Sequence, residues 1–219
     1  MPKYDRWNVA IFGKHLWNVH TKLNVELGAR YDLAKMKVAS YFDDVLYEYL
    51  IDRGTAEITA KDNAQRSNAL NKDFSRGNVA LGASYQISED WESTFTVASN
   101  FRFPTAMELS SNGIHHGAFR HEKGNPNLDV EKGWAFDLSQ HYHINNFKIN
   151  ASAYLYYFTN YIFLKPTGSF SILPHGGQVY EYSQSKAMLS GIEVDAHYQL
   201  KKLSLQAQFA YLYNQQISA

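Results

Sequence analysis

Polar and apolar residues alternate one by one along much of the chain, which is the pattern of an extended strand whose two faces meet different surroundings. The alternation is strict from Leu23, which shares one face with Val25 and Leu27, whereas Asn24 and Glu26 occupy the other face. The clearest copies cover residues 23–31, 79–87, 147–155 and 203–211, and weaker copies cover 7–17, 91–101, 134–142 and 188–198. This predicts about eight strands, each near the length of roughly ten residues with which a tilted β-strand crosses a bilayer.

The links between these strands alternate in length. Short links are expected near residues 18–22, 88–90, 144–146 and 200–202, and long links near 32–73, 103–130 and 164–178. Tight periplasmic turns and large extracellular loops alternate in this way in outer-membrane β-barrels. We therefore predict an all-β fold for residues 1–219: an antiparallel, up-and-down transmembrane β-barrel that is only partly contained in this chain.

Residue types at the strand ends and on the polar face favour the same fold. Aromatic residues stand near the expected ends, at Trp17, Trp91, Trp134, Tyr31, Tyr85, Tyr142, Tyr198, Tyr211 and Tyr213. Amphipathic rings form girdles at the two membrane interfaces of such barrels. The face opposite the apolar one is suited to a wet lumen, with Glu26, Arg30, Thr94, Thr96, Asp137, Lys148, Asn150, Glu193, Asp195, Gln206 and Gln208.

The composition excludes several other classes of protein and of site. The charges cancel, with 21 Lys and Arg against 21 Asp and Glu, so a nucleic-acid partner is not expected. The absence of cysteine excludes disulfides, Cys-ligated zinc and iron–sulfur clusters. No apolar run reaches the roughly 18 residues of a transmembrane helix, and the first residues do not have the pattern of a secretion signal.

With short links on the periplasmic side, an eight-strand set would begin and end outside the cell, so we expect an excerpt of a larger barrel.

Two motifs in the second long link resemble those of the TonB-dependent outer-membrane receptors. Residues 100–109 read NFRFPTAMEL and residues 122–131 read EKGNPNLDVE, which are similar to that family's Phe-Arg-x-Pro…Glu-Leu and Gly-Asn-Pro-x-Leu segments. The segments LGARYD at 27–32 and GIEVD at 191–195 agree with the same family. Arg102 of the first motif and Glu131 of the second could pair across the mouth of the barrel, where a solvated pair would contribute little.

The resemblance implies a role and partners. It places the chain in the late part of a 22-stranded barrel in the outer membrane of a Gram-negative bacterium, surrounded by membrane lipid. The family takes up scarce nutrients such as ferric siderophores or haem, with energy from an inner-membrane coupling protein. The family's plug domain and coupling motif are not recognisable in this sequence. The resemblance implies a transporter, not an enzyme, and no cofactor.

The candidate ligand-binding residues are three histidines in the second long link. His115, His116 and His121 lie within seven positions of one another. Neutral imidazole is a common ligand of zinc, copper and haem iron. In the resembling family, haem receptors have a histidine between the two motifs. The alternative is that these histidines belong to a polar loop and bind nothing.

Other functions remain open at this point. A soluble β-rich module that binds carbohydrate or another ligand would also need many aromatic residues and alternating strands, and a passive porin would have the same barrel pattern. An enzyme is not expected, because the chain has no Gly-x-Ser-x-Gly elbow, His-Glu-x-x-His pair, phosphate loop or dinucleotide fingerprint.

Overall fold

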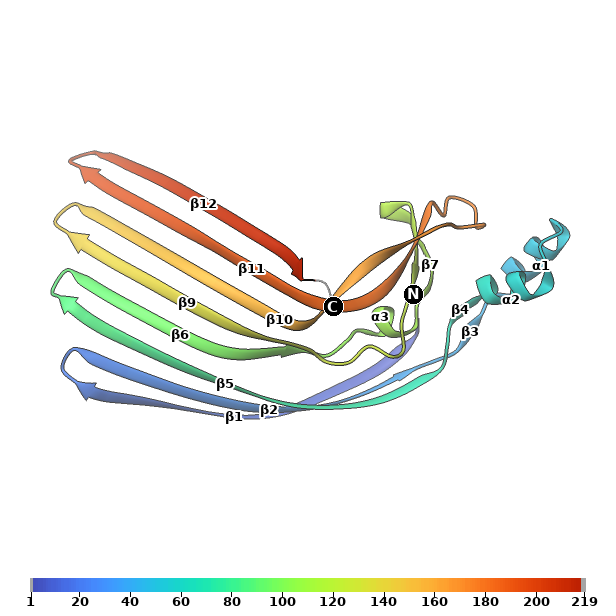
Figure 1. Ribbon diagram of the computed structural model, residues 1–219, viewed down its shortest axis with the longest axis horizontal. Helices are drawn as coiled ribbons and strands as arrows, with labels where there is room; N and C mark the ends of the chain where they lie inside the picture. Colours follow the sequence, from blue (N-terminus) through green and yellow to red (C-terminus); the bar gives the residue numbers. More distant parts are fainter. Residues whose placement is uncertain (1, 218–219) are drawn as a thin grey trace.

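Eight long antiparallel strands form one open, curved sheet in a computed structural model that describes residues 2–217 (Figure 1). Their order in the sheet is their order in the chain, and each strand pairs with the next. The strands are β1 (Tyr4–His20), β2 (Leu23–Val38), β5 (Leu70–Ser88), β6 (Trp91–Arg102), β9 (Glu131–Ile144), β10 (Phe147–Phe170), β11 (Gln178–Leu200) and β12 (Leu203–Ile217). The prediction of an up-and-down β-barrel sheet is confirmed, and the sheet does not close within this chain.

Two-residue turns connect the strands at one end, which we call the turn end. They consist of residues 21–22, 89–90, 145–146 and 201–202. Two of them hold a residue with positive φ, Asn145 at 50° and Lys201 at 51°, which is common in two-residue hairpin turns. All longer connections lie at the opposite end, which we call the loop end (Figure 1).

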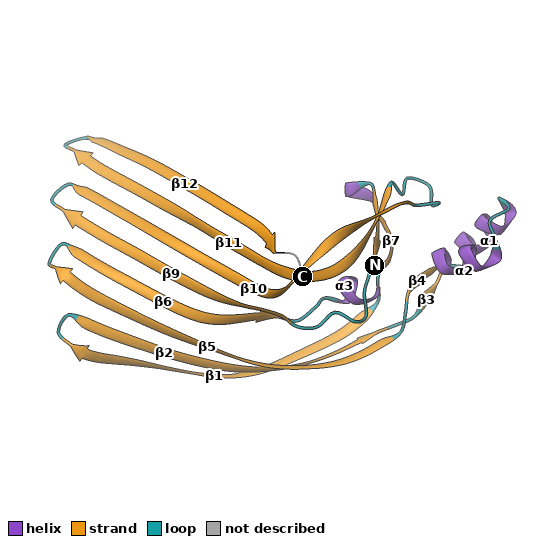
Figure 2. Cartoon of the chain, viewed as in Figure 1, coloured by secondary structure: helices purple, strands orange, loops and turns teal. Residues whose placement is uncertain are grey.

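Short elements occur only in the long connections, as Figure 2 shows. The connection between β2 and β5 holds β3 (Tyr41–Phe42), α1 (Asp44–Asp52), α2 (Glu57–Ala64) and β4 (Gln65–Ser67). The connection between β6 and β9 holds α3 (Ala106–Ser110), β7 (Asn112–His115), the 3-10 turn η1 (His116–Ala118) and β8 (Arg120–Lys123). Among residues 2–217, no helix is long and apolar enough to cross a membrane.

The two faces of the sheet differ as the alternation predicts. On the outer face, large apolar side chains are exposed, for example Leu27 (55% exposed), Val79 (50%) and Phe209 (61%). The inner face carries polar rows, because the strand register aligns residues of neighbouring strands. One such row consists of Ser84, Thr94, Ser139, Ser152 and Glu193. The apolar faces therefore do not pack against one another in a second layer, which is the arrangement of a barrel wall in lipid.

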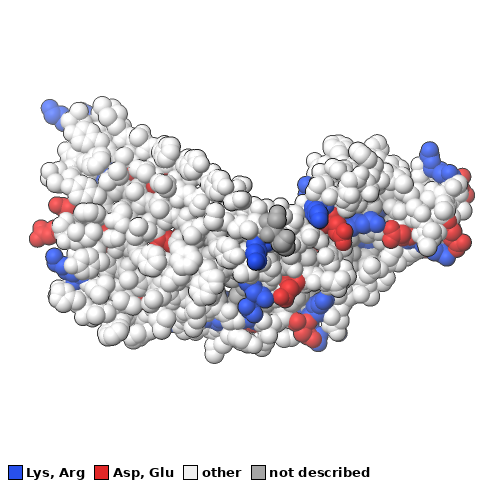
Figure 3. Space-filling model, viewed as in Figure 1, with Lys and Arg blue, Asp and Glu red and all other residues white. Residues whose placement is uncertain are grey.

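Both faces exchange their polarity near the loop end. On β2, the inner face becomes apolar after Leu33, because Ala34 and Met36 are buried there at 3% and 0% exposure. The outer face becomes charged, with Lys35 pairing with Asp73 of β5 at 3.4 Å. Lipid disfavours charged side chains on this face, so the exchange marks the level at which the strands leave the hydrocarbon. Figure 3 shows charged side chains at the turn end and from the middle of the molecule towards the loop end, with a mostly uncharged band between these two regions.

This exchange of polarity shortens two of the expected long links. β2 runs to Val38 and β5 begins at Leu70, so that the first link covers 39–69 and not 32–73. The third link covers 171–177 and not 164–178, and the second covers 103–130 as predicted from the sequence. β2 continues beyond the expected end because its alternation persists with Ala34, Met36 and Val38 turned inward.

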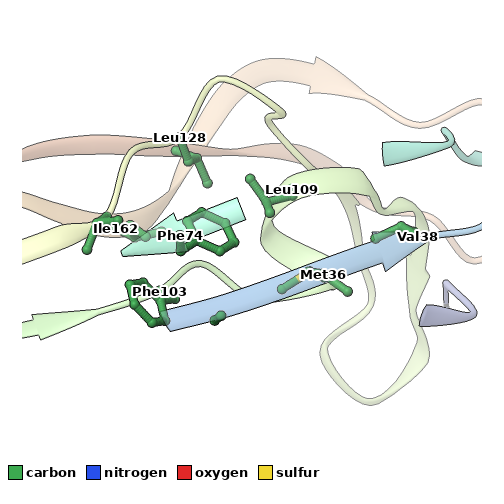
Figure 4. Close-up of a cluster of buried hydrophobic side chains, with 10 residues drawn as sticks. Met36, Val38, Phe74, Phe103, Leu109, Leu128 and Ile162 are labelled. Carbon is green, nitrogen blue, oxygen red and sulfur yellow. The ribbon is translucent and has the colours of Figure 1, made fainter. Parts of the chain in front are cut away.

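A hydrophobic core lies between the inner face and the second link (Figure 4). Met36 of β2 and Phe74 of β5 pack here with Phe103, Leu109 and Leu128 of the link. The rings of Phe74 and Phe103 stack with their centroids 5.2 Å apart. The rest of the cluster is Ala34, Val38, Ala106, Val130 and Ile162. This core fixes the 103–130 link against the sheet, so the link is a folded structure.

Candidate ligand-binding mouth

Three connections meet at the loop end of the sheet: residues 39–69, 103–130 and 171–177, which we call loops A, B and C. Leu50 and Ala60 of loop A form a small buried core with Leu173 of loop C. Ile114 of loop B packs against the same core. The three loops therefore share side-chain packing, although each is joined to a different pair of strands.

Arg102 holds the base of loop B, where β6 ends and β9 begins. Its guanidinium contacts Glu108 of α3 at 2.8 Å and Glu131 of β9 at 3.1 Å. The carboxylate of Glu131 also accepts the backbone N–H of Ile162 on β10 at 2.8 Å. Arg102 and Glu131 do pair, as the sequence suggested, but the carboxylate is largely buried and not solvated. The pair is part of a three-residue network, whose two carboxylates are only 13% and 10% exposed.

Glu108 also orders the short helix α3. Its side chain accepts the backbone N–H of Thr105 at 2.7 Å, and the Thr105 hydroxyl accepts the backbone N–H of Glu108 at 3.2 Å. This reciprocal pair is a capping box, which satisfies two free donors at the start of a helix. The Phe-Arg-x-Pro…Glu-Leu motif thus folds the entry of loop B through Arg102, Thr105 and Glu108.

The three candidate histidines of loop B have different surroundings. His115 ends β7 and His116 begins η1, and both side chains are exposed. His121 lies in β8 and is 1% exposed. Its two ring nitrogens are engaged, Nε2 with Asn112 Oδ1 at 2.7 Å and Nδ1 with Ser171 Oγ at 2.9 Å. The structure therefore brings His115 and His116 together at the surface and places His121 in the interior.

Burial also changes the acidity of His121. The pKa of its ring is lowered to about 4, first because burial disfavours the charged form and then because Lys123 and Arg66 are nearby. Its imidazole is therefore neutral at physiological pH. Among residues 2–217, no group of three or more His, Asp or Glu side chains is arranged to hold a metal ion.

The sequence did not indicate the residues that surround His121. Asn112 and Ser171 are ordinary polar residues in loops, and Ser171 is 50 positions away from the histidine. Glu122, which is 3% exposed, was not singled out either. It accepts hydrogen bonds from Arg120 Nε at 2.7 Å and from the Tyr182 hydroxyl at 3.0 Å. Its neighbourhood depends on β8 pairing in parallel with β11, which no local pattern predicts.

Comparison with known proteins gives one family and many similar structures. The family model described as TonB dependent receptor-like, beta-barrel matches residues 1–218. A search of curated proteins finds no match.

Several solved structures share this fold. The copper transporter OprC is 16% identical with a TM-score of 0.70, over 96% of this chain and 30% of that chain. The hemophore receptor HasR of Serratia marcescens, a double mutant in complex with its hemophore HasA and heme, is 18% identical with a TM-score of 0.68, over 95% and 34%. The ferric yersiniabactin uptake receptor FyuA from Yersinia pestis is 12% identical with a TM-score of 0.63, over 98% and 28%. The chain thus spans about a third of the length of each of these proteins.

The family match and the structural likeness agree on the same architecture. The match covers both motifs of loop B and all eight long strands. The chain therefore belongs to the TonB-dependent receptor-like β-barrel family.

Proposed function

We propose that this chain is part of an outer-membrane, TonB-dependent active transporter for a scarce nutrient such as a ferric siderophore or haem. The observation that carries the proposal is the opposite polarity of the two faces of the sheet, together with the folded loops at its loop end. The outer face is apolar and the inner face is polar, and at the loop end loop B packs on the inner face and loops A and C pack against loop B. A structured mouth above a polar lumen suits the selective binding of a solute from outside the cell.

The family and the similar structures support a transport role. The family consists of receptors and transporters, not enzymes. The printed names of three similar structures refer to copper, to a hemophore with heme, and to ferric yersiniabactin. In our proposal the chain acts within a longer receptor, with an inner-membrane energy-coupling protein as its partner and the Gram-negative outer membrane as its site.

His115 and His116 are the proposed ligand-contacting residues of loop B. Both are exposed at the loop end, where an imidazole nitrogen is free to bind haem iron or another chelated metal. His121 belongs to the same candidate set, but its ring nitrogens become available only when its bonds to Asn112 and Ser171 break.

Growth on a single iron source tests the transport role. The complete receptor is expressed in a bacterial strain that lacks its own iron receptors, and haem or individual ferric siderophores are supplied as the only iron. We expect growth with at least one of these sources, and loss of that growth when the energy-coupling protein is deleted. Uptake that does not depend on the coupling protein would instead indicate a passive porin.

A double variant tests the histidines separately. His115→Ala with His116→Ala is expected to reduce haem uptake at limiting concentration by at least tenfold, because both surface imidazoles are removed. His143→Ala is the matched control, because this exposed histidine lies at the turn end. Unchanged haem uptake in the double variant, in a receptor that transports haem, would remove the histidines from the site.

A further inference from the structure

His121 is buried where loops B and C meet, and each of its ring nitrogens has one partner. Asn112 Oδ1 lies 2.7 Å from Nε2, and Ser171 Oγ lies 2.9 Å from Nδ1. Asn112 belongs to loop B, and Ser171 belongs to loop C. The imidazole thus bridges two loops whose nearest residues are separated by 40 positions or more along the chain.

The surrounding hydrogen bonds determine which nitrogen carries the proton. The Asn112 amide donates through Nδ2 to the backbone oxygens of Asp62 at 2.6 Å and Gln65 at 2.9 Å, so its Oδ1 faces His121 as an acceptor. His121 Nε2 therefore carries the proton and donates it to Asn112. Nδ1 is then an acceptor, and the Ser171 hydroxyl donates to it while accepting the backbone N–H of Leu173 at 3.1 Å.

This chain of bonds reaches all three loops. Asp62 and Gln65 lie in loop A, Asn112 and His121 in loop B, and Ser171 in loop C. An ion pair from Lys123 Nζ to Asp62 at 3.0 Å joins loops A and B a second time. The shared apolar core of Leu50, Ala60 and Leu173 lies close to the same junction.

We propose that Asn112, His121 and Ser171 form a loop latch, which holds loops A, B and C as one body, and that His121 is its central positioning residue. The latch sets the place of His115 and His116, because β7 and β8 pair directly and His115 is opposite Arg120 in that register. The effect on uptake rests on the proposed function, whereas the latch itself does not.

The latch is expected to respond to acid. The charged groups around the ring are Lys123 of β8, Arg66 of β4 and Asp62 of α2, and the two cations oppose protonation together with burial. Above the ordinary pKa of 6.5, the ring is neutral whether the loops are latched or released, so pH has no effect. As the pH falls from 6.5 towards 4, the released ring takes up a proton and the latched ring does not, so release is favoured. From pH 7.5 to pH 5 the equilibrium should shift towards release by about 30-fold.

Hydrogen exchange on the complete receptor in detergent measures the latch without any nutrient. In the unaltered receptor we expect the amides of the three loops to be protected at pH 7.5, and to lose protection together at pH 5 after correction for intrinsic exchange rates.

His121→Leu removes both hydrogen bonds and should raise exchange in all three loops at pH 7.5. His121→Gln retains one donor and one acceptor, so it should keep the protection and lose the dependence on pH. His143→Leu, at the turn end, is the control and should behave as the unaltered receptor does.

Two partial variants separate the links of the latch. Ser171→Ala should raise exchange most in loop C, and Asn112→Ala should raise it most in loop A. Increased exchange confined to loop B in His121→Leu, or an unchanged pH response in His121→Gln, would overturn the proposal. If His121→Leu does not fold, the pH response of His121→Gln still decides. A receptor that shows the latch but transports none of the iron sources would leave the latch standing and reject the transport role.

Discussion

Arg102 illustrates how a single side chain can order a loop at the scale of one residue. Its guanidinium is shared by Glu108 and Glu131, two nearly buried carboxylates that would repel each other without it. An arginine suits this place because its planar fork offers several donors in fixed directions. The entry and the exit of loop B are joined through this one cation.

Removing the cation should therefore destabilise the receptor more than removing an exposed lysine. Arg102→Ala is expected to cost about 2 kcal/mol, because two partly buried carboxylates lose the cation that balances their charge. Lys14→Ala is the control, since its pair with Glu26 is 61% and 45% exposed and such pairs contribute about 0–1 kcal/mol. The measurement is the free energy of unfolding in detergent. Equal losses in the two variants would contradict the buried network, and partial recovery is expected in Arg102→Ala combined with Glu108→Gln and Glu131→Gln.

The sequence predicted the pairing of Arg102 with Glu131 but not the burial of His121, and the difference has a physical reason. Arg102 and Glu131 could be paired in advance because each stands at a strand end next to loop B, and both ends meet in a hairpin. The burial of His121 could not, because β8 has only four residues and its environment comes from Ser171 in another loop. A histidine in a polar segment has the same sequence pattern whether it is exposed or buried.

The local sequence predicts the positions of the strands better than the positions of the helices. The strands were predictable because lipid on one side and water on the other impose a period of two along each strand. The helices of loop A were missed, although α1 shows some signals: Asp43 caps it by accepting the Leu46 N–H at 3.0 Å, and Leu46 and Leu50 are one turn apart. Helix α2 has no side-chain cap, so its place follows from packing against α1.

The identity of the two faces of a strand can be tested with neighbouring residues of β6. Val97 lies on the outer face and Thr96 on the inner face, in register with Leu81 and Gly82 of β5. Val97→Arg is expected to cost about 2–4 kcal/mol, because the charge enters lipid near the middle of the strand. Thr96→Arg should be close to neutral, because the inner face meets water and polar groups. Unfolding in lipid vesicles measures both, and a larger loss for Thr96→Arg would mean that the faces are assigned the wrong way round.

The whole molecule extends well beyond the membrane. β10 has 24 residues and β11 has 23, whereas a tilted strand needs about 9–11 residues to cross the hydrocarbon. The same strand therefore passes through two solvents. Lipid stabilises the half near the turn end, and the packing of the loops stabilises the half near the loop end.

These two halves should respond differently to urea. In detergent micelles, the part of β10 beyond the irregularity between Phe158 and Tyr161 is expected to lose amide protection at a lower urea concentration than the part before it. The reason is that urea acts on the water-exposed packing and reaches the micelle-covered half less readily. Residue-resolved hydrogen exchange at increasing urea concentration is the measurement. A single midpoint for all of β10 would show that the strand unfolds as one unit.

The parallel pairing of β8 with β11 affects how the strand edge can interact with other protein chains. β12 pairs with β11 over Lys186–Leu200, and β8 pairs with β11 at Val179–Glu181. Free strand edges invite foreign chains to add to a sheet and so begin aggregation. By placing a strand of its own at that position, the molecule shields this stretch of its rim from neighbouring receptors.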